Sequence, residues 1–297
     1  MNLKNVKNEL IGKWASFLCV ALVIVLTISI IFFIASKGLA IFFSNHISFS
    51  NVFLNTDWFP DRSAAEGGPS FGILPFLAGS IVVSLFAVLL SAPLSIISAF
   101  FITEIAPSIG QRFLQPAVEL LAGIPSVVYG WIGLSVLVPF IRSTFGGLGV
   151  SVLAAGLVLA VMILPTTVSV ATDRIKALPN SYKEASYALG STRWQLIRRV
   201  LFPAALPGIM TGLILGLARA FGEALAVQMV LGNVRKIPHS LLDPATTLTS
   251  GITMDMGYTA MGSPWNNALW TMALVLLIMS FFFIIIIRLV SKRGVNQ

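Results

Sequence analysis

The sequence predicts an all-α integral membrane protein with about six transmembrane helices. Of its 297 residues, 57% are hydrophobic and only 10% are charged, whereas soluble globular domains carry about 25% charged residues. A membrane-spanning helix needs about 20 mainly apolar residues, because a helix rises about 1.5 Å per residue and the hydrocarbon layer is about 30 Å thick. Six stretches meet this requirement: residues 14–34, 73–102, 114–141, 150–170, 206–231 and 268–290.

The first stretch follows Lys4, Lys7 and Lys13. A cationic start before an apolar run is also typical of a secretory signal peptide, but the apolar core of such a peptide has only about 7–15 residues and precedes a small-residue cleavage site. This run is as long as a full membrane span, and no convincing cleavage site follows it. We therefore expect a retained first span.

The second and third stretches are long enough to require a tilt, a kink or protrusion into water. Pro93 and Pro125 lie inside them, and proline kinks a helix. In the third stretch Gly123 weakens the helix further, and the hydroxyl groups of Ser126 and Tyr129 follow near membrane depth. Broken helices at such depth are tolerated where they line protein or water. The pattern is compatible with ligand contact by Ser126 and Tyr129 and also with a plain kink.

The distribution of cations predicts the orientation. If the N-terminus is cytoplasmic, thirteen of the nineteen Lys and Arg residues fall in cytoplasmic segments and five in outside loops. Cytoplasmic loops of membrane proteins carry an excess of Lys and Arg. We therefore expect both termini to be cytoplasmic. Because topology accounts for the net charge of +8, no nucleic-acid partner is needed to explain it.

The two outside loops, residues 36–72 and 232–267, are long enough to be functional, although a tolerated surface insertion is an equal reading. His46 and His239 lie apart in these loops without the spacing of metal ligands, and Cys19 is the single cysteine, so we expect no metal site. The chain also lacks a Gly-x-x-x-x-Gly-Lys-[Ser/Thr] phosphate loop. We therefore expect no cofactor in this chain and no ATP hydrolysis by it.

The cytoplasmic segment 171–205 has a pattern of its own. Pro179 and the polar residues after it form a helix start signal, an apolar stripe at helical spacing follows, and Gly190 is a stop signal. The pattern predicts a short amphipathic helix, a turn and a second helix that leads into span five. From the residues alone, an amphipathic helix lying in the lipid headgroup layer is an equal reading.

The fifth stretch contains two charges, Arg219 and Glu223. An ionised side chain near the middle of a bilayer costs roughly 2.5–3.5 kcal/mol on insertion scales, so these residues should face protein or water. As a continuous helix, the stretch would place Gly208, Gly212 and Gly216 on the same arc as both charges. One reading is an internal ion pair that locks the helix. The other is that Arg219 contacts an anion in transit while Glu223 tunes its charge.

The segment 184–203 resembles the coupling motif of ABC importer permeases, which reads Glu-Ala-Ala, three residues, Gly, nine residues, Ile-x-Leu-Pro. Its spacing matches throughout, with mild departures at Ser186, Val200 and Phe202. In that family the segment is a short helix that enters a cleft of the ATP-hydrolysing subunit. The residues that the resemblance places at this contact are Glu184, Ala185, Ser186 and Gly190.

Three further stretches, residues 71–76, 119–130 and 216–223, resemble the C-type permease subunit of the bacterial phosphate-specific transporter (PstC-like). The resemblance implies a type I ABC importer permease fold in a prokaryotic cell membrane and a role for Arg219 and Glu223 in translocation. It implies inorganic phosphate as the substrate. The implied partners are a second, A-type permease subunit, two copies of an ATP-binding subunit that holds ATP and Mg, and an extracytoplasmic phosphate-binding protein.

These inferences divide the chain into an anchor helix and first loop (1–72), a permease core (73–290) with a coupling segment (179–203), and a tail (291–297). Three alternatives stay open. The chain is a permease for another oxyanion such as molybdate, sulfate or phosphonate; it is an ion-gradient transporter or channel that uses Arg219 and Glu223 as a relay; or it is a membrane scaffold or sensor. If the chain is a scaffold or sensor, replacement of Arg219 and Glu223 by alanine should cause no loss of transport.

Overall fold

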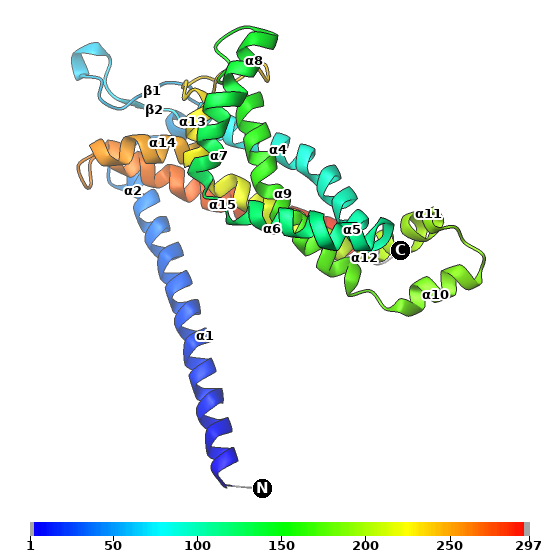
Figure 1. Cartoon of the computed structure of the whole chain (residues 1–297). Helices are drawn as coiled ribbons and strands as arrows, with labels where there is room; N and C mark the ends of the chain where they lie inside the picture. The colour runs from blue at the N-terminus through cyan, green and yellow to red at the C-terminus, as the bar shows by residue number, and fades with distance from the viewer. Residues whose placement is uncertain (1–2, 294–297) are drawn as a thin grey trace.

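The protein is almost entirely helical (Figure 1), as the computed structural model of residues 3–293 shows. Six helices are long and apolar enough to cross a membrane, which confirms the predicted number. Their limits differ from the predicted ones, chiefly where helices break. The six are Gly12–Phe43, Leu74–Ile105, Ser126–Phe145, Val152–Lys176, Arg193–Gly222 and Pro264–Ile286.

The first helix, α1 (Leu3–Gly38), projects away from the other helices (Figure 1). The most apolar part of α1 has no buried residue. Among residues 12–38 the buried position lies at the end of the helix: Thr271 Oγ1 of α15 (Pro264–Arg293) donates to the carbonyl oxygen of Gly38 at 2.7 Å. An apolar surface of this length is stable only beside lipid or another apolar surface.

The segment after α1 is a compact cap at one end of the bundle, called the loop end below. Its strands pair antiparallel, with Trp58 opposite Phe71. Trp58 is buried and its ring meets Phe76 at 5.2 Å between centroids, which fixes the cap to the first turn of the second span. The elements of the cap are α2 (Ala40–Phe43), α3 (Phe49–Phe53), β1 (Trp58–Phe59), η1 (Ala64–Glu66) and β2 (Ser70–Phe71).

The centre of the bundle is the pair formed by α4 (Leu74–Phe100) and α9 (Val152–Lys176), which pack along much of their length. Gly156 of α9 permits this approach, because the ring of Phe86 lies where a side chain would begin. The π-helical turn η2 (Phe101–Ile105) extends α4 at the end opposite the cap, called the α10 end below. Most of α9 is buried, as expected for a central span.

The predicted third span, 114–141, is wrong as one helix. α6 (Gln115–Gly123) and α7 (Ser126–Ile132) run in different directions (Figure 1). The chain turns at Ile124, whose backbone is extended (ψ 128°), because the residue before a proline is disfavoured in the helical region. The predicted break is therefore confirmed. The neighbouring elements are α5 (Pro107–Ile109), η3 (Gly110–Leu114), η4 (Gly133–Leu137) and α8 (Val138–Phe145).

The predicted helix–turn–helix in residues 171–205 is confirmed, but the fifth span differs at both ends from the predicted 206–231. Its helical run begins at Arg193 and ends at Gly222, and a short helix follows the break. The elements are α10 (Asn180–Ala188), α11 (Arg193–Leu196), η5 (Ile197–Leu201), α12 (Phe202–Gly222) and α13 (Leu225–Leu231).

The second long loop contains a buried helix that the sequence reading missed, α14 (Leu248–Asp255), followed by η6 (Met256–Tyr258). The buried face of α14 consists mainly of small and hydroxyl residues such as Thr249, Ser250 and Gly251, so it lacks the large apolar stripe that signals a helix. α15 then runs back through the bundle to Arg293, which includes the start of the predicted tail; residues 294–297 lie outside the described residues.

Candidate functional site

Arg219 lies on the face of α12 that packs against α9. Its Nη1 atom donates to Thr166 Oγ1 of α9 at 3.2 Å. Two of the glycines on this face lie against α9: a Cβ at Gly216 would lie 2.8 Å from Thr167 Oγ1, and one at Gly212 would lie 3.2 Å from the Thr167 carbonyl oxygen. Gly212 and Gly216 therefore allow α12 to lie close to α9. The half-buried Arg219 lies beside the Thr166 hydroxyl group.

Glu223 is the residue at which the helix that carries Arg219 stops. α12 ends at Gly222, and Glu223 has an extended backbone with ψ 122°. Its carboxylate accepts a hydrogen bond from the N–H of Ala226 at 3.2 Å, in the first turn of α13. A carboxylate is favourable there because the first N–H groups of a helix lack partners within the helix. The two charges form no ion pair within residues 3–293.

Tyr129 of α7 forms a hydrogen bond across the break to α6. Its hydroxyl donates to the carbonyl oxygen of Leu121 at 2.8 Å. This carbonyl lies in the last turn of α6, where the intrahelical partners run out, and it also accepts from the N–H of Ile124 at 3.3 Å. Ser126 is the first residue of α7 and is half-buried. The two hydroxyl groups thus differ: the Tyr129 hydroxyl has a structural bond, while Ser126 stands where the chain changes direction.

The two broken spans meet. A Cβ at Gly130 of α7 would lie 2.9 Å from Cα of Ala226 in α13, so the second half of α7 touches the first turn of α13 backbone to backbone. Tyr129, Ala220 and Ala226 belong to one buried cluster, and Ala220 directly follows Arg219 in α12. The arrangement gathers Arg219, Glu223 and Tyr129 around two irregular stretches of backbone. A planar guanidinium in such a place is suited to a tetrahedral oxyanion.

A second group of predicted residues lies on α10. Glu184 and Ala185 are exposed, whereas Ser186 is buried, and its Oγ atom lies 2.5 Å from Ser191 Oγ. The expectation that Ser186 adds to an exposed small surface is therefore wrong. Gly190 has φ +74° and closes the turn after α10, in agreement with the tight turn that the sequence predicted.

Large apolar side chains surround the exposed side of α10. Leu189 is 88% exposed, Trp194 is 65% exposed, and Tyr182 and Tyr187 are each about half exposed. Contiguous exposed apolar groups mark interaction surfaces for proteins or membranes. The predicted apolar stripe of this helix thus faces outward instead of into the bundle.

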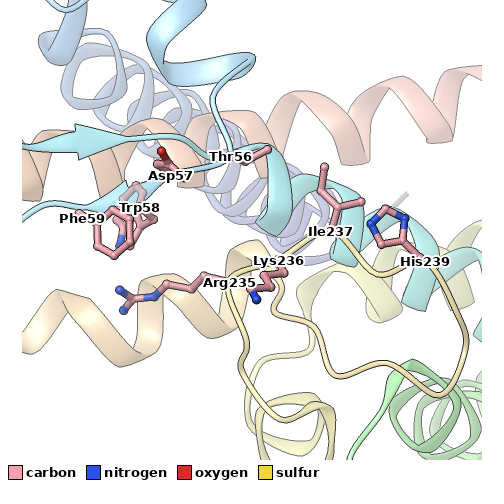
Figure 2. A pocket seen from close by; sticks show the side chains of 8 residues that line it. All are labelled: Thr56, Asp57, Trp58, Phe59, Arg235, Lys236, Ile237 and His239. Atoms are coloured by element: carbon pink, nitrogen blue, oxygen red, sulfur yellow. The ribbon is translucent and has the colours of Figure 1, made fainter.

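At the loop end, the two long loops enclose a pocket of about 480 Å³ (Figure 2). Its walls are the strand β1 and the segment after α13, and it carries more basic than acidic side chains. The lining residues are Thr56, Asp57, Trp58, Phe59, Arg235, Lys236, Ile237 and His239.

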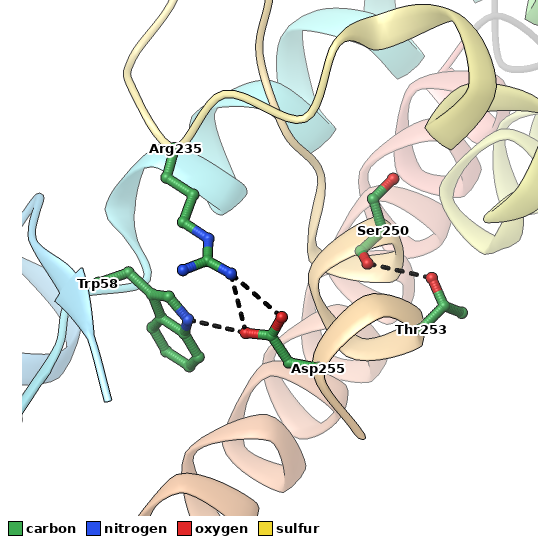
Figure 3. A network of polar contacts seen from close by, with 5 residues as sticks. All are labelled: Trp58, Arg235, Ser250, Thr253 and Asp255. Atoms are coloured by element: carbon green, nitrogen blue, oxygen red, sulfur yellow. Dashed lines mark hydrogen bonds and ion pairs between the residues drawn. The ribbon is translucent and has the colours of Figure 1, made fainter. Parts of the chain in front are cut away.

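Asp255 at the end of α14 holds this pocket together (Figure 3). Its carboxylate is buried and accepts hydrogen bonds from Trp58 Nε1 at 3.0 Å and from Arg235 Nη2 at 3.1 and 3.2 Å. Trp58 and Asp255 are 197 residues apart, so no spacing signal in the sequence indicates the contact. Among residues 3–293 no group of three His, Cys, Asp or Glu side chains is placed to hold a metal ion.

α14 also reaches the break in span five. Thr249 Oγ1 donates to the carbonyl oxygen of Glu223 at 2.9 Å, and Thr253 Oγ1 donates to Gln228 Oε1 at 3.0 Å. One short helix therefore contacts the pocket of the loop end through Asp255 and the irregular backbone beside Arg219 through Thr249.

Comparisons with known proteins agree with this architecture. The sequence model of the family described as "Binding-protein-dependent transport system inner membrane component" matches residues 91–294. The "Probable ABC transporter permease protein YqgH" of Bacillus subtilis is 51% identical over 96% of this chain and 92% of its own length. The "Phosphate transport system permease protein PstC" of Xylella fastidiosa (strain 9a5c) is 36% identical over 82% of this chain and 79% of its own length.

Two solved structures share the fold. A chain of a bacterial ABC transporter that imports the polysaccharide alginate superposes with a TM-score of 0.64 and 14% identity, over 97% of this chain and 99% of that chain. A chain of the MetNI methionine ABC transporter, in an inward-facing conformation, superposes with a TM-score of 0.54 and 22% identity, over 76% of this chain and 93% of that chain.

Proposed function

The chain belongs to the family of inner-membrane components of binding-protein-dependent transport systems, the permeases of ABC importers, and from this premise we propose that it forms half of the translocation pathway of an ATP-driven importer of inorganic phosphate. In this proposal the anion passes the two broken spans. Arg219 contacts it, Glu223 offsets the positive charge so that the anion is released again, and Ser126 and Tyr129 belong to the same pathway.

The proposal rests on the contacts that the Arg219 guanidinium makes and on its lack of an ion-pair partner among residues 3–293. A guanidinium has five N–H donors, and the bond to Thr166 uses one of them. No carboxylate of residues 3–293 is within ion-pair distance. Arg219 is therefore positioned but not neutralised, at a place where two helices are interrupted. Phosphate is favoured over other oxyanions because several relatives at 32–37% identity carry the name of a phosphate transport permease.

The exposed surfaces support the proposed partners. We assign the outward face of α10, with Glu184, Ala185 and Gly190, to the cleft of an ATP-binding subunit, which is present in two copies and holds ATP and Mg. The uncovered apolar length of α1 suits lipid or the second, A-type permease subunit. The basic pocket at the loop end suits an extracytoplasmic phosphate-binding protein.

This assignment sets the orientation. The α10 end faces the cytoplasm together with both termini, and the loop end faces outward from a prokaryotic cell membrane. The excess of Lys and Arg in the segments at the α10 end supports this orientation, because cytoplasmic loops of membrane proteins are rich in these residues.

The test is uptake by the whole complex reconstituted into vesicles. We expect ATP-dependent accumulation of radiolabelled phosphate that unlabelled sulfate, molybdate and phosphonate do not suppress at equal concentration. Accumulation of sulfate or molybdate in place of phosphate would refute the substrate. Uptake by this chain alone, without ATP or partner subunits, would show an ion-gradient transporter or a channel instead.

A further inference from the structure

We propose that the ion pair between Lys183 and Glu104 is the connection through which α10 moves the second membrane span. The proposal rests on the proposed docking of an ATP-binding subunit on α10. Lys183 Nζ donates to Glu104 Oε1 at 2.7 Å. Lys183 belongs to α10, and Glu104 belongs to η2, the π-helical turn that ends span two. The two residues are 79 positions apart, so the pair is a tertiary contact between two elements.

The two sides of α10 have different environments. Lys183 and Ser186 are three residues apart, so they lie on one face of the helix, and both are less exposed than their neighbours Glu184 and Ala185. On this inner face Lys183 bonds Glu104, and Ser186 bonds Ser191. The outer face, which carries Glu184, makes neither contact. A partner bound to the outer face would therefore contact a helix whose inner face is fixed by two polar contacts, Lys183 with Glu104 and Ser186 with Ser191.

The backbone joins α10 to spans four and five but not to span two. On one side, α9 ends at Lys176 and α10 begins at Asn180. After the turn at Gly190 the chain continues through α11 and η5 into α12, so a movement of α10 reaches span five covalently. The end of α4 lies against the same region, because Phe100 shares a buried cluster with Leu196 and Leu201. Those two residues belong to α11 and η5. For α10 itself, the Lys183–Glu104 pair supplies the link to span two.

The surroundings of the pair make it more than a loose surface contact. The Glu104 side chain is 10% exposed and the Lys183 side chain 30%, and partly buried pairs are screened by salt much less than exposed ones. The pair is one of two ion pairs that the structure shows within residues 3–293. Glu104 also sits in a π-helical turn, a geometry that is frequent at functional sites.

The experiment uses charge reversal in the reconstituted complex. The variants are Lys183→Glu, Glu104→Lys and the double variant, which restores opposite charges with their positions exchanged. Lys176→Glu is the matched control, since Lys176 lies at the same end of the bundle but bonds Gln115. For each complex the measured quantities are subunit composition, ATP hydrolysis and the ratio of phosphate imported to ATP hydrolysed.

We expect each single reversal to lower that ratio by roughly fivefold or more, the smaller end of coupling between linked sites, while the complex still assembles. The double variant should regain most of the ratio, and Lys176→Glu should keep it. A ratio that stays unchanged in both single variants, or a double variant no better than the singles, would overturn the proposal.

A second readout does not depend on the substrate. Spin labels at Ser181→Cys in α10 and Leu94→Cys in α4, in a chain that carries Cys19→Ser, report the distance between the two elements. We expect that ATP leaves this distance constant with the pair intact and changes it in Lys183→Glu. The same change with and without the pair would contradict the proposal. If phosphate is the wrong substrate, the unmutated complex fails to import it while this distance result stands.

Discussion

Arg219 and Thr166 join α12 to α9 through a hydrogen bond of 3.2 Å from Nη1 to Oγ1. The bond fixes the direction of the guanidinium without cancelling its charge, because a threonine hydroxyl is neutral. Glu223, the nearest carboxylate in the sequence, instead accepts a hydrogen bond at the start of α13. The positive charge of Arg219 is therefore fixed in direction but not neutralised by a carboxylate of residues 3–293.

Arg219→Ala is expected to reduce phosphate import roughly ten- to a hundredfold, since a hydrogen bond to a charged group contributes about 1.5–3 kcal/mol. Assembly of the complex should persist, because the side chain makes one bond within the chain. Thr166→Val is the matched control that removes only the positioning bond, and we expect a smaller loss. Initial rates of uptake into vesicles measure both. Normal import by a well-expressed Arg219→Ala variant would remove the anion contact.

Ser126→Ala and Tyr129→Phe each remove one hydroxyl group beside the break between α6 and α7. We expect Ser126→Ala to raise the KM for phosphate a few-fold, in keeping with a hydrogen bond of about 0.5–1.5 kcal/mol, and to leave the melting temperature unchanged. Tyr129→Phe should lower the melting temperature, because the hydrogen bond across the break is lost and the Leu121 carbonyl keeps only its bond from the Ile124 N–H. An unchanged KM for Ser126→Ala would exclude this hydroxyl from the pathway.

Gly190→Val is expected to uncouple ATP hydrolysis from import. The residue has φ +74° and open space around a Cβ, so the effect comes from the backbone. A left-handed conformation costs an L-residue about 1–2 kcal/mol, and β-branched residues tolerate it least. Asn adopts this conformation more easily, so Gly190→Asn should stay closer to normal. Normal phosphate import per ATP in Gly190→Val would count against docking through this turn.

Asp255→Asn is expected to destabilise the loop end. The carboxylate is buried but the Arg235 side chain is 40% exposed, so the cost should lie below the about 3–5 kcal/mol of a fully buried ion pair. It should exceed that of a single hydrogen bond, because the carboxylate accepts bonds from both Arg235 and Trp58. Trp58→Phe keeps an aromatic ring beside Phe76 and removes one hydrogen bond, so its cost should be about 0.5–1.5 kcal/mol. The melting temperatures of the two purified variants in detergent measure which substitution destabilises the chain more. A melting temperature lower for Trp58→Phe than for Asp255→Asn would contradict this order.

Much of the architecture could be predicted from local patterns. Span number follows from apolar length, and the helix–turn–helix around Gly190 follows from start and stop signals. The break at Pro125 was predictable because proline acts on its own neighbours. The end of α12 at Gly222 was not: the sequence continues with apolar residues, so the pattern favours one unbroken helix through Glu223. The short helix α14 was missed because its buried face is small and polar.

The sequence by itself determined that this protein is an integral membrane protein with about six helical spans, and its motif spacing carries the resemblance to ABC importer permeases, since helix period, bilayer thickness and motif spacing are properties of neighbouring residues. Tertiary structure decided which side chains meet: Arg219 with Thr166, Lys183 with Glu104, and Trp58 with Asp255. These partners are 53, 79 and 197 residues apart. Such contacts arise only when helices pack, because packing fixes the direction of a side chain toward segments that the chain reaches much later.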